Sequence, residues 1–216
     1  MGRDSGWLSI WSSSTATECS WTASRSPCAW ARRRCGAWAG RSRRRSTPSG
    51  SSAARTSTGS SRWARPPPGW WEQVRTEYEA AVKAELCAVE GIVEALDRLT
   101  LPVCVASNGR HTTIRRSLEL TGLAERFGGR VFSAEDVAQG KPAPDLFLHA
   151  AATLGAAPER CVVVEDSPFG VTAAVSAGMR CLAFAGGLTP ASRLNGLGAT
   201  LFHHPAALPD LIDALR

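Results

Sequence analysis

Three short apolar runs between residues 102 and 164 are each followed by residues that could do chemistry. The first run is followed by Ser107 and Asn108, the second by a loop that carries Lys141, and the third by Glu165 and Asp166. Carboxylate oxygens are the ligands that Mg²⁺ prefers, and hydroxyl and ammonium groups donate well to phosphoryl oxygens. Taken in this order, the residues predict a site for an anion together with a divalent cation.

Each of these residues also has a plain structural alternative. Ser107 could cap the helix that follows it, and Lys141 could be an ordinary solvated lysine. Glu165 and Asp166 could be a charge pair favoured by the dipole at a helix N-terminus. These alternatives stay open for each residue alone, but their occurrence together after successive strands favours a site.

Helical and apolar segments alternate from residue 70 onward and supply the framework for this site. The predicted strands cover 102–106, 130–133, 161–164, 180–184 and 200–202. The predicted helices cover 72–86, 89–99, 112–120, 123–127, 145–154, 169–177 and 208–215. Such alternation gives βαβ units, and hence an α/β fold with a parallel sheet covered on both faces. Ligands bind at the carboxyl ends of the strands in these sheets, which is where the polar residues lie.

The charge of the chain is distributed unevenly. The 216 residues carry a net charge of +6, but residues 1–68 hold twelve arginines and two acidic residues, a net +10, while residues 69–216 sum to −4. The basic average therefore does not make the whole chain a nucleic-acid-binding protein. No run approaches the roughly 18 apolar residues of a transmembrane helix, so we do not expect a membrane protein.

Residues 1–68 have a composition that does not suit a folded domain. They contain sixteen serines and six of the eight tryptophans, but no valine or phenylalanine, and no helical or alternating periodicity. Such a segment buries too little apolar surface to offset its ordering entropy, so we expect the N-terminal third to be largely disordered. Three interpretations are open: an organellar transit peptide, a basic arm that binds nucleic acid, or a translation in the wrong reading frame.

The genetic code offers a test of the third interpretation. Codons can be formed from the last base of one residue's codon and the first two bases of the next. Permitted codons for 9–26 then spell D-L-V-V-F-D-C-D-G-V-L-V-D-S-E-P-L, and those for 36–53 spell G-L-G-W-P-L-T-E-A-E-x-x-E-R-F-V-G. The first string is an apolar strand with an acidic, glycine-containing loop, and the second contains a turn and a capping-box-like helix start. We hypothesise that a frame error covers residues 1 to about 65 and that the native frame resumes near residues 66–68.

Three segments in series resemble the motifs of a known family. They are V-C-V-A-S-N-G at 103–109, G-K-P-A-P-D at 140–145 and V-V-V-E-D-S-P-F-G at 162–170. They resemble the second, third and fourth motifs of the haloacid dehalogenase-like (HAD) hydrolases, in particular the phosphatase and β-phosphoglucomutase-like group. The alternate-frame string D-C-D-G-V-L-V-D-S-E resembles the missing first motif. The resemblance implies a Rossmann-like HAD core at 100–216, with 69–99 as the remnant of a helical cap and a connecting helix.

The resemblance also implies a role for each candidate residue. Ser107 and Lys141 would be catalytic and would bind the phosphoryl group of the substrate, with Asn108 beside them as a further substrate-binding residue. Asp166 would bind Mg²⁺ directly and Glu165 would help to hold the metal. The first motif would supply an aspartate nucleophile that forms an aspartyl-phosphate, and a second aspartate that acts as general acid and base.

The chain departs from the family at this first motif. Residues 14–19 are S-T-A-T-E-C where the acidic motif is expected, and the acids Asp4 and Glu18 are isolated and lie outside any predicted strand. The strand of the first motif normally occupies the centre of the family's sheet. We therefore expect a gap between the remaining strands with exposed edges, and a chain that is poorly stable and inactive as a phosphatase.

One function and two alternatives follow. The expected function is Mg²⁺-dependent hydrolysis of small phosphorylated metabolites, such as sugar phosphates. Dehalogenation is disfavoured because that reaction needs no metal, whereas the pair Glu165 and Asp166 indicates one. The alternatives are a sugar-phosphate mutase and a non-catalytic pseudoenzyme whose basic arm contacts nucleic acid, although we do not expect nucleic acid as a partner. The seven cysteines show no C-x-x-C spacing and no export signal is present, so we expect reduced thiols and a cytoplasmic protein.

Overall fold

The computed structural model describes residues 8–11 and 68–216. The chain divides into two compact units, one formed by Met1–Ser20 and Leu86–Arg216 and the other by Trp21–Glu85. In the second unit the described helix is α3 (Trp70–Glu85), with an acidic residue in its first turn and a lysine in its last, as the helix dipole favours. All other described helices and strands belong to the first unit, which is called the core below.

Six parallel strands form the sheet of the core in the order β3-β2-β1-β4-β5-β6. The strands are β1 (Leu8–Trp11), β2 (Val103–Ser107), β3 (Val131–Ser133), β4 (Cys161–Glu165), β5 (Arg180–Phe184) and β6 (Thr200–Phe202). The predicted α/β, Rossmann-like parallel sheet with flanking helices is therefore confirmed. Chain order reverses between β1 and β4, and in such sheets the crevice at the reversal is where ligands bind.

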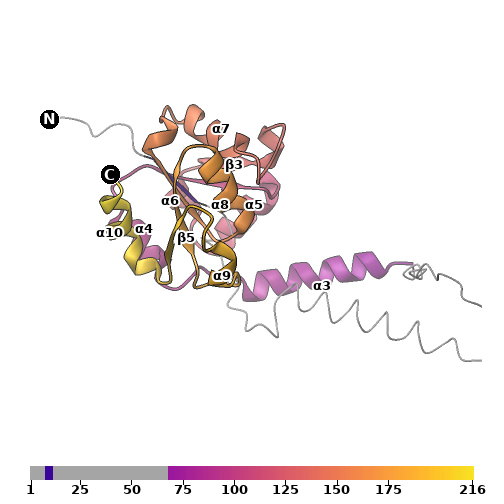
Figure 1. Cartoon of the computed structure of the whole chain (residues 1–216). Coiled ribbons are helices and arrows are strands. Elements are labelled where there is room, and N and C mark those ends of the chain that lie inside the picture. The colour runs from indigo at the N-terminus through magenta and orange to yellow at the C-terminus, as the bar shows by residue number, and fades with distance from the viewer. Residues whose placement is uncertain (1–7, 12–67) are drawn as a thin grey trace, which may run out of the picture. The chain divides into compact units, whose positions relative to one another are not determined.

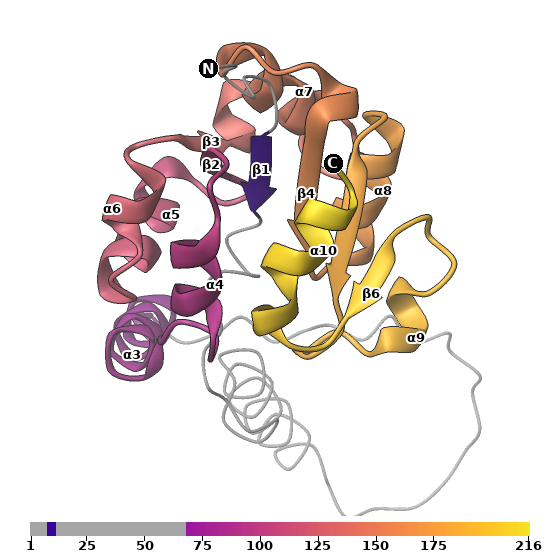
Figure 2. The ribbon, with the colours of Figure 1, turned by 90° about the vertical axis from the view of Figure 1, so that its left-hand side faces the viewer.

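Helices cover both faces of this sheet (Figures 1 and 2). On one face, α7 contacts β1, β2 and β3, and α8 contacts β4 and β5. On the other face, α5 and α6 contact β3 and β2, and α4 packs against α10. The helices of the core are α4 (Ile92–Arg98), α5 (His111–Leu120), α6 (Ala124–Phe127), α7 (Asp145–Thr153), α8 (Pro168–Ser176), α9 (Ala191–Leu194) and α10 (Leu208–Ala214).

Residues Leu8–Trp11 occupy the centre of the sheet, between β2 and β4 (Figure 2). The expected gap at this position is therefore wrong, and these four residues form a strand within the N-terminal third. The remainder of the N-terminal third lies outside the described residues. All four side chains are buried, and they alternate between the two faces, with Leu8 and Ile10 on one side and Trp11 on the other.

This central strand also buries polar atoms that it does not satisfy. The Ser9 hydroxyl and the Trp11 indole N–H have no hydrogen-bond partner among the described residues. A buried donor or acceptor without a partner costs about 1–3 kcal/mol. β1 is therefore held by its two backbone ladders and its apolar side chains, while two of its four side chains fit their positions poorly.

The other predicted elements lie within three residues of their expected ends. The largest difference is at α4, which begins at Ile92 instead of residue 89 because Gly91 adopts a left-handed φ of +79°. The four-residue α9 was not predicted, since so short a segment has no periodicity to detect. No helix within residues 68–216 is long and apolar enough to cross a membrane.

Three cysteines lie buried on the sheet face that α7 and α8 cover. Cys104, Cys161 and Cys181 lie on β2, β4 and β5, and each is a free thiol. Burial raises the pKa of the Cys161 thiol to about 11 and raises the pKa values of the other two further. These thiols therefore stay protonated and poorly reactive near neutral pH.

Candidate active site

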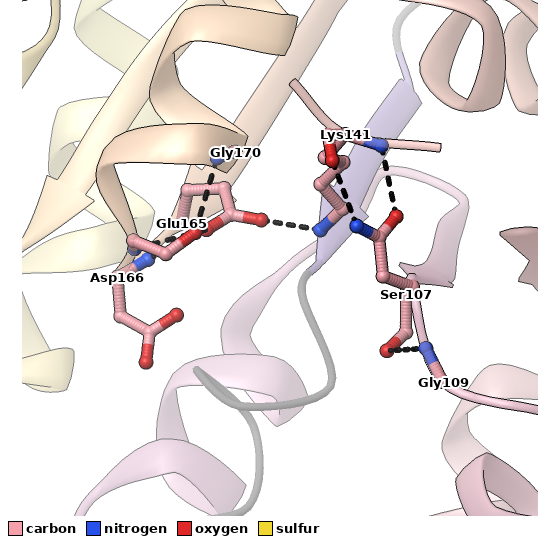
Figure 3. A network of polar contacts seen from close by, with 8 residues as sticks. Ser107, Gly109, Lys141, Glu165, Asp166 and Gly170 are labelled. Atoms are coloured by element: carbon pink, nitrogen blue, oxygen red, sulfur yellow. Dashed lines mark hydrogen bonds and ion pairs between the residues drawn. The ribbon is translucent and has the colours of Figure 1, made fainter. Parts of the chain in front are cut away.

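The carboxyl edge of the sheet brings the predicted site residues together. β2 ends at Ser107 and β4 ends at Glu165, with β1 between them in the sheet. Figure 3 shows Ser107, Lys141, Glu165 and Asp166 at this edge. Parallel strands all end on the same side of the sheet, which is why residues about 25–60 positions apart in sequence meet here.

Lys141 is buried at this edge and is not a solvated lysine. Its ammonium forms an ion pair with the Glu165 carboxylate, and the two side chains are 6% and 0% exposed. The same ammonium lies 4.9 Å from the centre of the Phe147 ring, which adds a cation–π contact. A buried charge needs such partners because an unpaired one is costly. The fold thus fixes a positive charge beside the end of the central strand.

The Glu165 carboxylate is engaged by the protein on both of its oxygens. One oxygen pairs with Lys141, and the other accepts the N–H of Asp166 at 3.0 Å, the N–H of Ser167 at 3.1 Å and the Ser167 hydroxyl at 2.9 Å. Ser167 also caps α8 by accepting the Gly170 N–H at 3.0 Å. Glu165 therefore orients Lys141 and ties it to the start of α8.

Asp166 is oriented differently from its neighbour. Its carboxylate points away from the pair formed by Glu165 and Lys141 (Figure 3). Its side chain is partly exposed, whereas that of Glu165 is fully buried. Of the two carboxylates, Asp166 is the one placed to meet a ligand that arrives from solvent.

Ser107 and Asn108 form the turn that follows β2. The Ser107 hydroxyl accepts the N–H of Gly109 at 3.1 Å, so it does not cap the next helix, whose N-cap is Arg110. The Asn108 side-chain amide donates to the carbonyl of Lys141 and accepts the N–H of Lys141, both at 2.9 Å. The turn after β2 is thereby joined directly to the loop that carries the lysine.

The beginning of that loop is anchored to the same turn. The Ser133 hydroxyl donates to the carbonyl of Gly109 at 2.7 Å, and the His111 ring pairs with Asp136 at 2.8 Å. Burial alone would raise the pKa of Asp136, but hydrogen bonds from His111 and from the Ser133 N–H outweigh it and hold the pKa below its usual value. The segment leading to Lys141 is therefore fixed at its start as well as at the lysine.

Two residues that shape the site were not predicted. Ser167 had a sequence signal, since a serine followed by proline at the start of a helix is typical of an N-cap with proline at the first helical position. Phe147 had none, because its contact with Lys141 depends on how α7 packs on the sheet. The Ser167 cap is a local contact that the sequence can predict, whereas the Phe147 contact joins distant segments and cannot be predicted in this way.

The described residues give Mg²⁺ an incomplete set of ligands. Within residues 8–11 and 68–216 there is no group of three or more His, Cys, Asp or Glu side chains that could hold a metal. Glu165 is committed to Lys141, which leaves Asp166 as the carboxylate of the predicted pair that fits a metal. Mg²⁺ commonly uses one or two protein carboxylates together with phosphate oxygens and water, so Asp166 fits a shared site and not a complete one.

A cavity of about 870 Å³ opens elsewhere, at the carboxyl ends of β5 and β6. Its walls come from the segment before α4, the end of β5 and the turn after β6, and they include Glu90, Phe184 and His203. None of the four candidate residues drawn together in Figure 3 lines this cavity. The cavity is therefore not part of the candidate site.

A comparison with known protein families identifies the family of the chain. Residues 55–178, more than half of the chain, match the family model of the haloacid dehalogenase-like hydrolases. The chain therefore belongs to the haloacid dehalogenase-like hydrolase family, as the three motifs in series indicated.

Two similar proteins from Escherichia coli (strain K12) are named as phosphatases. The 6-phosphogluconate phosphatase is 32% identical over 141 residues, which cover 65% of this chain and 63% of that protein. Hexitol phosphatase A is 36% identical over 117 residues, which cover 52% of this chain and 53% of that protein. The chain thus spans less than two thirds of the length of either relative.

Solved structures share the same fold. A HAD family hydrolase from Deinococcus radiodurans R1, crystallised with bound phosphate and sodium, superimposes with a TM-score of 0.69. The match covers 98% of this chain and 97% of that one at 24% identity. At this identity the similarity supports the fold of the core and leaves the activity to be argued from the site.

Proposed function

We propose that this core is the catalytic scaffold of a Mg²⁺-dependent phosphatase that acts on small phosphorylated metabolites. The observation that carries the proposal is the buried Lys141 ammonium, held by Glu165 at the carboxyl edge of the sheet between the Ser107 turn and Asp166. A fixed positive charge and a hydroxyl next to a carboxylate are what a phosphate monoester and its metal require. The two E. coli relatives, which are named for phosphorylated sugar derivatives, support this substrate class.

Each residue has a defined part in the proposed reaction. Lys141 stabilises the negative charge on the phosphoryl oxygens, and Ser107 donates a hydrogen bond to one of them. Glu165 keeps the ammonium in place, since a lysine tied to a buried carboxylate has little freedom to move. Mg²⁺, when bound with the help of Asp166, neutralises phosphoryl charge as a Lewis acid.

The attacking group is the part that this sequence lacks. β1 ends at Trp11, and residues 12–19 are S-S-S-T-A-T-E-C, with no aspartate to form an aspartyl-phosphate. The alternate-frame string for this stretch contains D-C-D-G directly after an apolar run. We therefore propose that the chain as printed is inactive and that the restored frame is the active enzyme.

Turnover of p-nitrophenyl phosphate with Mg²⁺ tests this proposal in two proteins. One is the printed chain, and the other is the same gene with the frame corrected over residues 1 to about 65. We expect no turnover above buffer from the first protein and clear turnover from the second. Lys141→Ala in the corrected protein should lower kcat by about 10²–10³-fold, the usual effect of removing one charge-stabilising group.

A surface lysine supplies the matched control for that substitution. Lys83→Ala, on the exposed side of α3, should leave kcat of the corrected protein unchanged. A corrected protein without turnover on p-nitrophenyl phosphate, 6-phosphogluconate and hexitol phosphates would contradict the proposed activity. Turnover by the printed chain would contradict the assignment of the missing nucleophile.

A further inference from the structure

The side chain of Asn108 is used on both sides by one residue of another loop. Its amide nitrogen donates to the Lys141 carbonyl at 2.9 Å, and its Oδ1 accepts the Lys141 N–H at 2.9 Å. The two residues are 33 positions apart in the chain. One amide therefore clamps the backbone of the lysine between two hydrogen bonds.

Gly140 gives this clamp the space that it needs. A Cβ at position 140 would lie 2.7 Å from Asn108 Oδ1 and 3.1 Å from the Ala134 Cβ. The first distance is shorter than real Cβ contacts allow, and the second is tight. Glycine at position 140 is thus required by the close approach of the amide.

The clamp determines where the lysine side chain starts. Asn108 follows β2 and Glu165 ends β4, so Lys141 is fixed at its backbone beside one strand and at its ammonium beside another, with β1 between them. The side chain thus spans the end of the central strand. If the backbone of the lysine moved, its ammonium could not keep both Glu165 and the Phe147 ring as partners.

We propose that Asn108 is a positioning residue, which acts on the reaction through Lys141 and whose side chain is not a ligand of the substrate. This role rests on the proposed function only in that Lys141 is taken to meet the phosphoryl group. An asparagine suits the position because its amide carries a donor and an acceptor at once, whereas aspartate has no donor and alanine has neither.

The chain offers a direct measurement of this clamp because it contains two lysines. Lys83 is exposed on α3 and Lys141 is buried in the site. The full 216-residue chain is acetylated with N-hydroxysuccinimide acetate, and mass spectrometry follows the two lysines separately. Lys83 is then an internal reference for the reagent, and the Lys141 rate reports how well its ammonium is held.

Asn108→Ala should raise the Lys141 rate relative to Lys83 by about tenfold, because two hydrogen bonds to its backbone are lost. Asn108→Asp keeps the acceptor and loses the donor, so its increase should be smaller. Gly140→Ala should also raise the Lys141 rate, because the added Cβ would displace the side-chain amide of Asn108. The double variant should add little to either single change, since both break the same contact.

Two controls separate positioning from general loosening of the fold. Asn195→Ala, at the exposed end of α9, should leave the Lys141 rate unchanged. The buried thiols of Cys104, Cys161 and Cys181 should stay protected from iodoacetamide in all variants. An unchanged Lys141 rate in Asn108→Ala overturns the proposal. Joint exposure of Lys141 and the thiols in both Asn108→Ala and Gly140→Ala overturns it too, since it marks a purely structural residue.

Acetylation in the presence of inorganic phosphate tests the positioning role of Asn108 and the proposed phosphatase function separately. If Lys141 meets phosphoryl oxygens, millimolar phosphate with Mg²⁺ should slow its acetylation in the unmodified chain, and less so in Asn108→Ala. A clamp effect without phosphate protection contradicts the proposed function and leaves the positioning of Lys141 standing. Phosphate protection that is equal in the unmodified chain and in Asn108→Ala contradicts the positioning role and leaves the function standing.

Discussion

At the scale of single residues, the site depends on a carboxylate whose two oxygens are both bound by the protein. Glu165 is fully buried and is held by Lys141, by two backbone N–H groups and by the Ser167 hydroxyl. Hydrogen bonds to a carboxylate that is paired with a buried ammonium keep both charges from being left unsatisfied. The carboxylate therefore supports the charge that the proposed reaction uses.

Gly170 makes room for this carboxylate. A Cβ at position 170 would overlap the Glu165 carboxyl group, which lies under the first turn of α8. Gly170→Ala should therefore displace Glu165 and lower the free energy of unfolding by about 1–3 kcal/mol, the range for overpacked sites. Urea unfolding measures the change. Ser176→Ala, on an exposed position of the same helix, is the control and should stay within about 0.5 kcal/mol of the unmodified chain.

At the scale of the elements, β1 is the strand with the poorest match between sequence and position. Its neighbours β2 and β4 are rich in valine, whereas β1 is Leu-Ser-Ile-Trp and buries a hydroxyl and an indole N–H without partners among the described residues. The alternate-frame string begins D-L-V-V-F at the codon that joins residues 9 and 10, so its apolar run L-V-V-F starts within β1 and extends past Trp11. In that frame an apolar side chain replaces Trp11 and its unpartnered indole N–H, which is a physical argument in favour of the frame hypothesis.

Two buried serines test whether the Ser9 hydroxyl lacks a hydrogen-bond partner, because replacing each serine by alanine should change the free energy of unfolding in opposite directions. Ser9 is fully buried with an unpartnered hydroxyl, whereas the equally buried Ser133 donates to Gly109 and accepts from the Glu135 N–H. Ser9→Ala should raise the free energy of unfolding by about 1 kcal/mol, and Ser133→Ala should lower it by about 1–2 kcal/mol. Urea unfolding of both variants checks the pair. A loss of stability in Ser9→Ala would show that its hydroxyl has a partner.

At the scale of the whole molecule, the strand order places Leu8–Trp11, near the N-terminus, at the centre of the sheet. β1 is hydrogen-bonded to β2 on one side and to β4 on the other. These two neighbours do not pair with each other, so without β1 the sheet would separate into the halves β3-β2 and β4-β5-β6. Removing a central strand exposes two unpaired edges, whereas removing an edge strand exposes only one.

Two truncations measure this dependence. A chain that begins at residue 8 keeps β1, and a chain that begins at residue 12 lacks it. The first should unfold cooperatively in urea, as judged by circular dichroism and tryptophan fluorescence together. The second should lose the cooperative transition, because its sheet has no central strand. Equal cooperativity in the two chains would mean that residues 8–11 do not hold the sheet together.

The sequence by itself determined the alternation of helices and strands, the α/β class and the three segments that carry Ser107, Lys141 and Asp166. These features are local, since apolar periodicity, glycines at helix ends and polar residues after strands are all visible within about ten residues. The tertiary structure decided that Leu8–Trp11 fills the centre of the sheet, that Glu165 pairs with Lys141, and that Asn108 holds the lysine backbone. Strand neighbours and long-range hydrogen-bond partners are chosen by competition among contacts distant in the chain, and no local pattern contains that information.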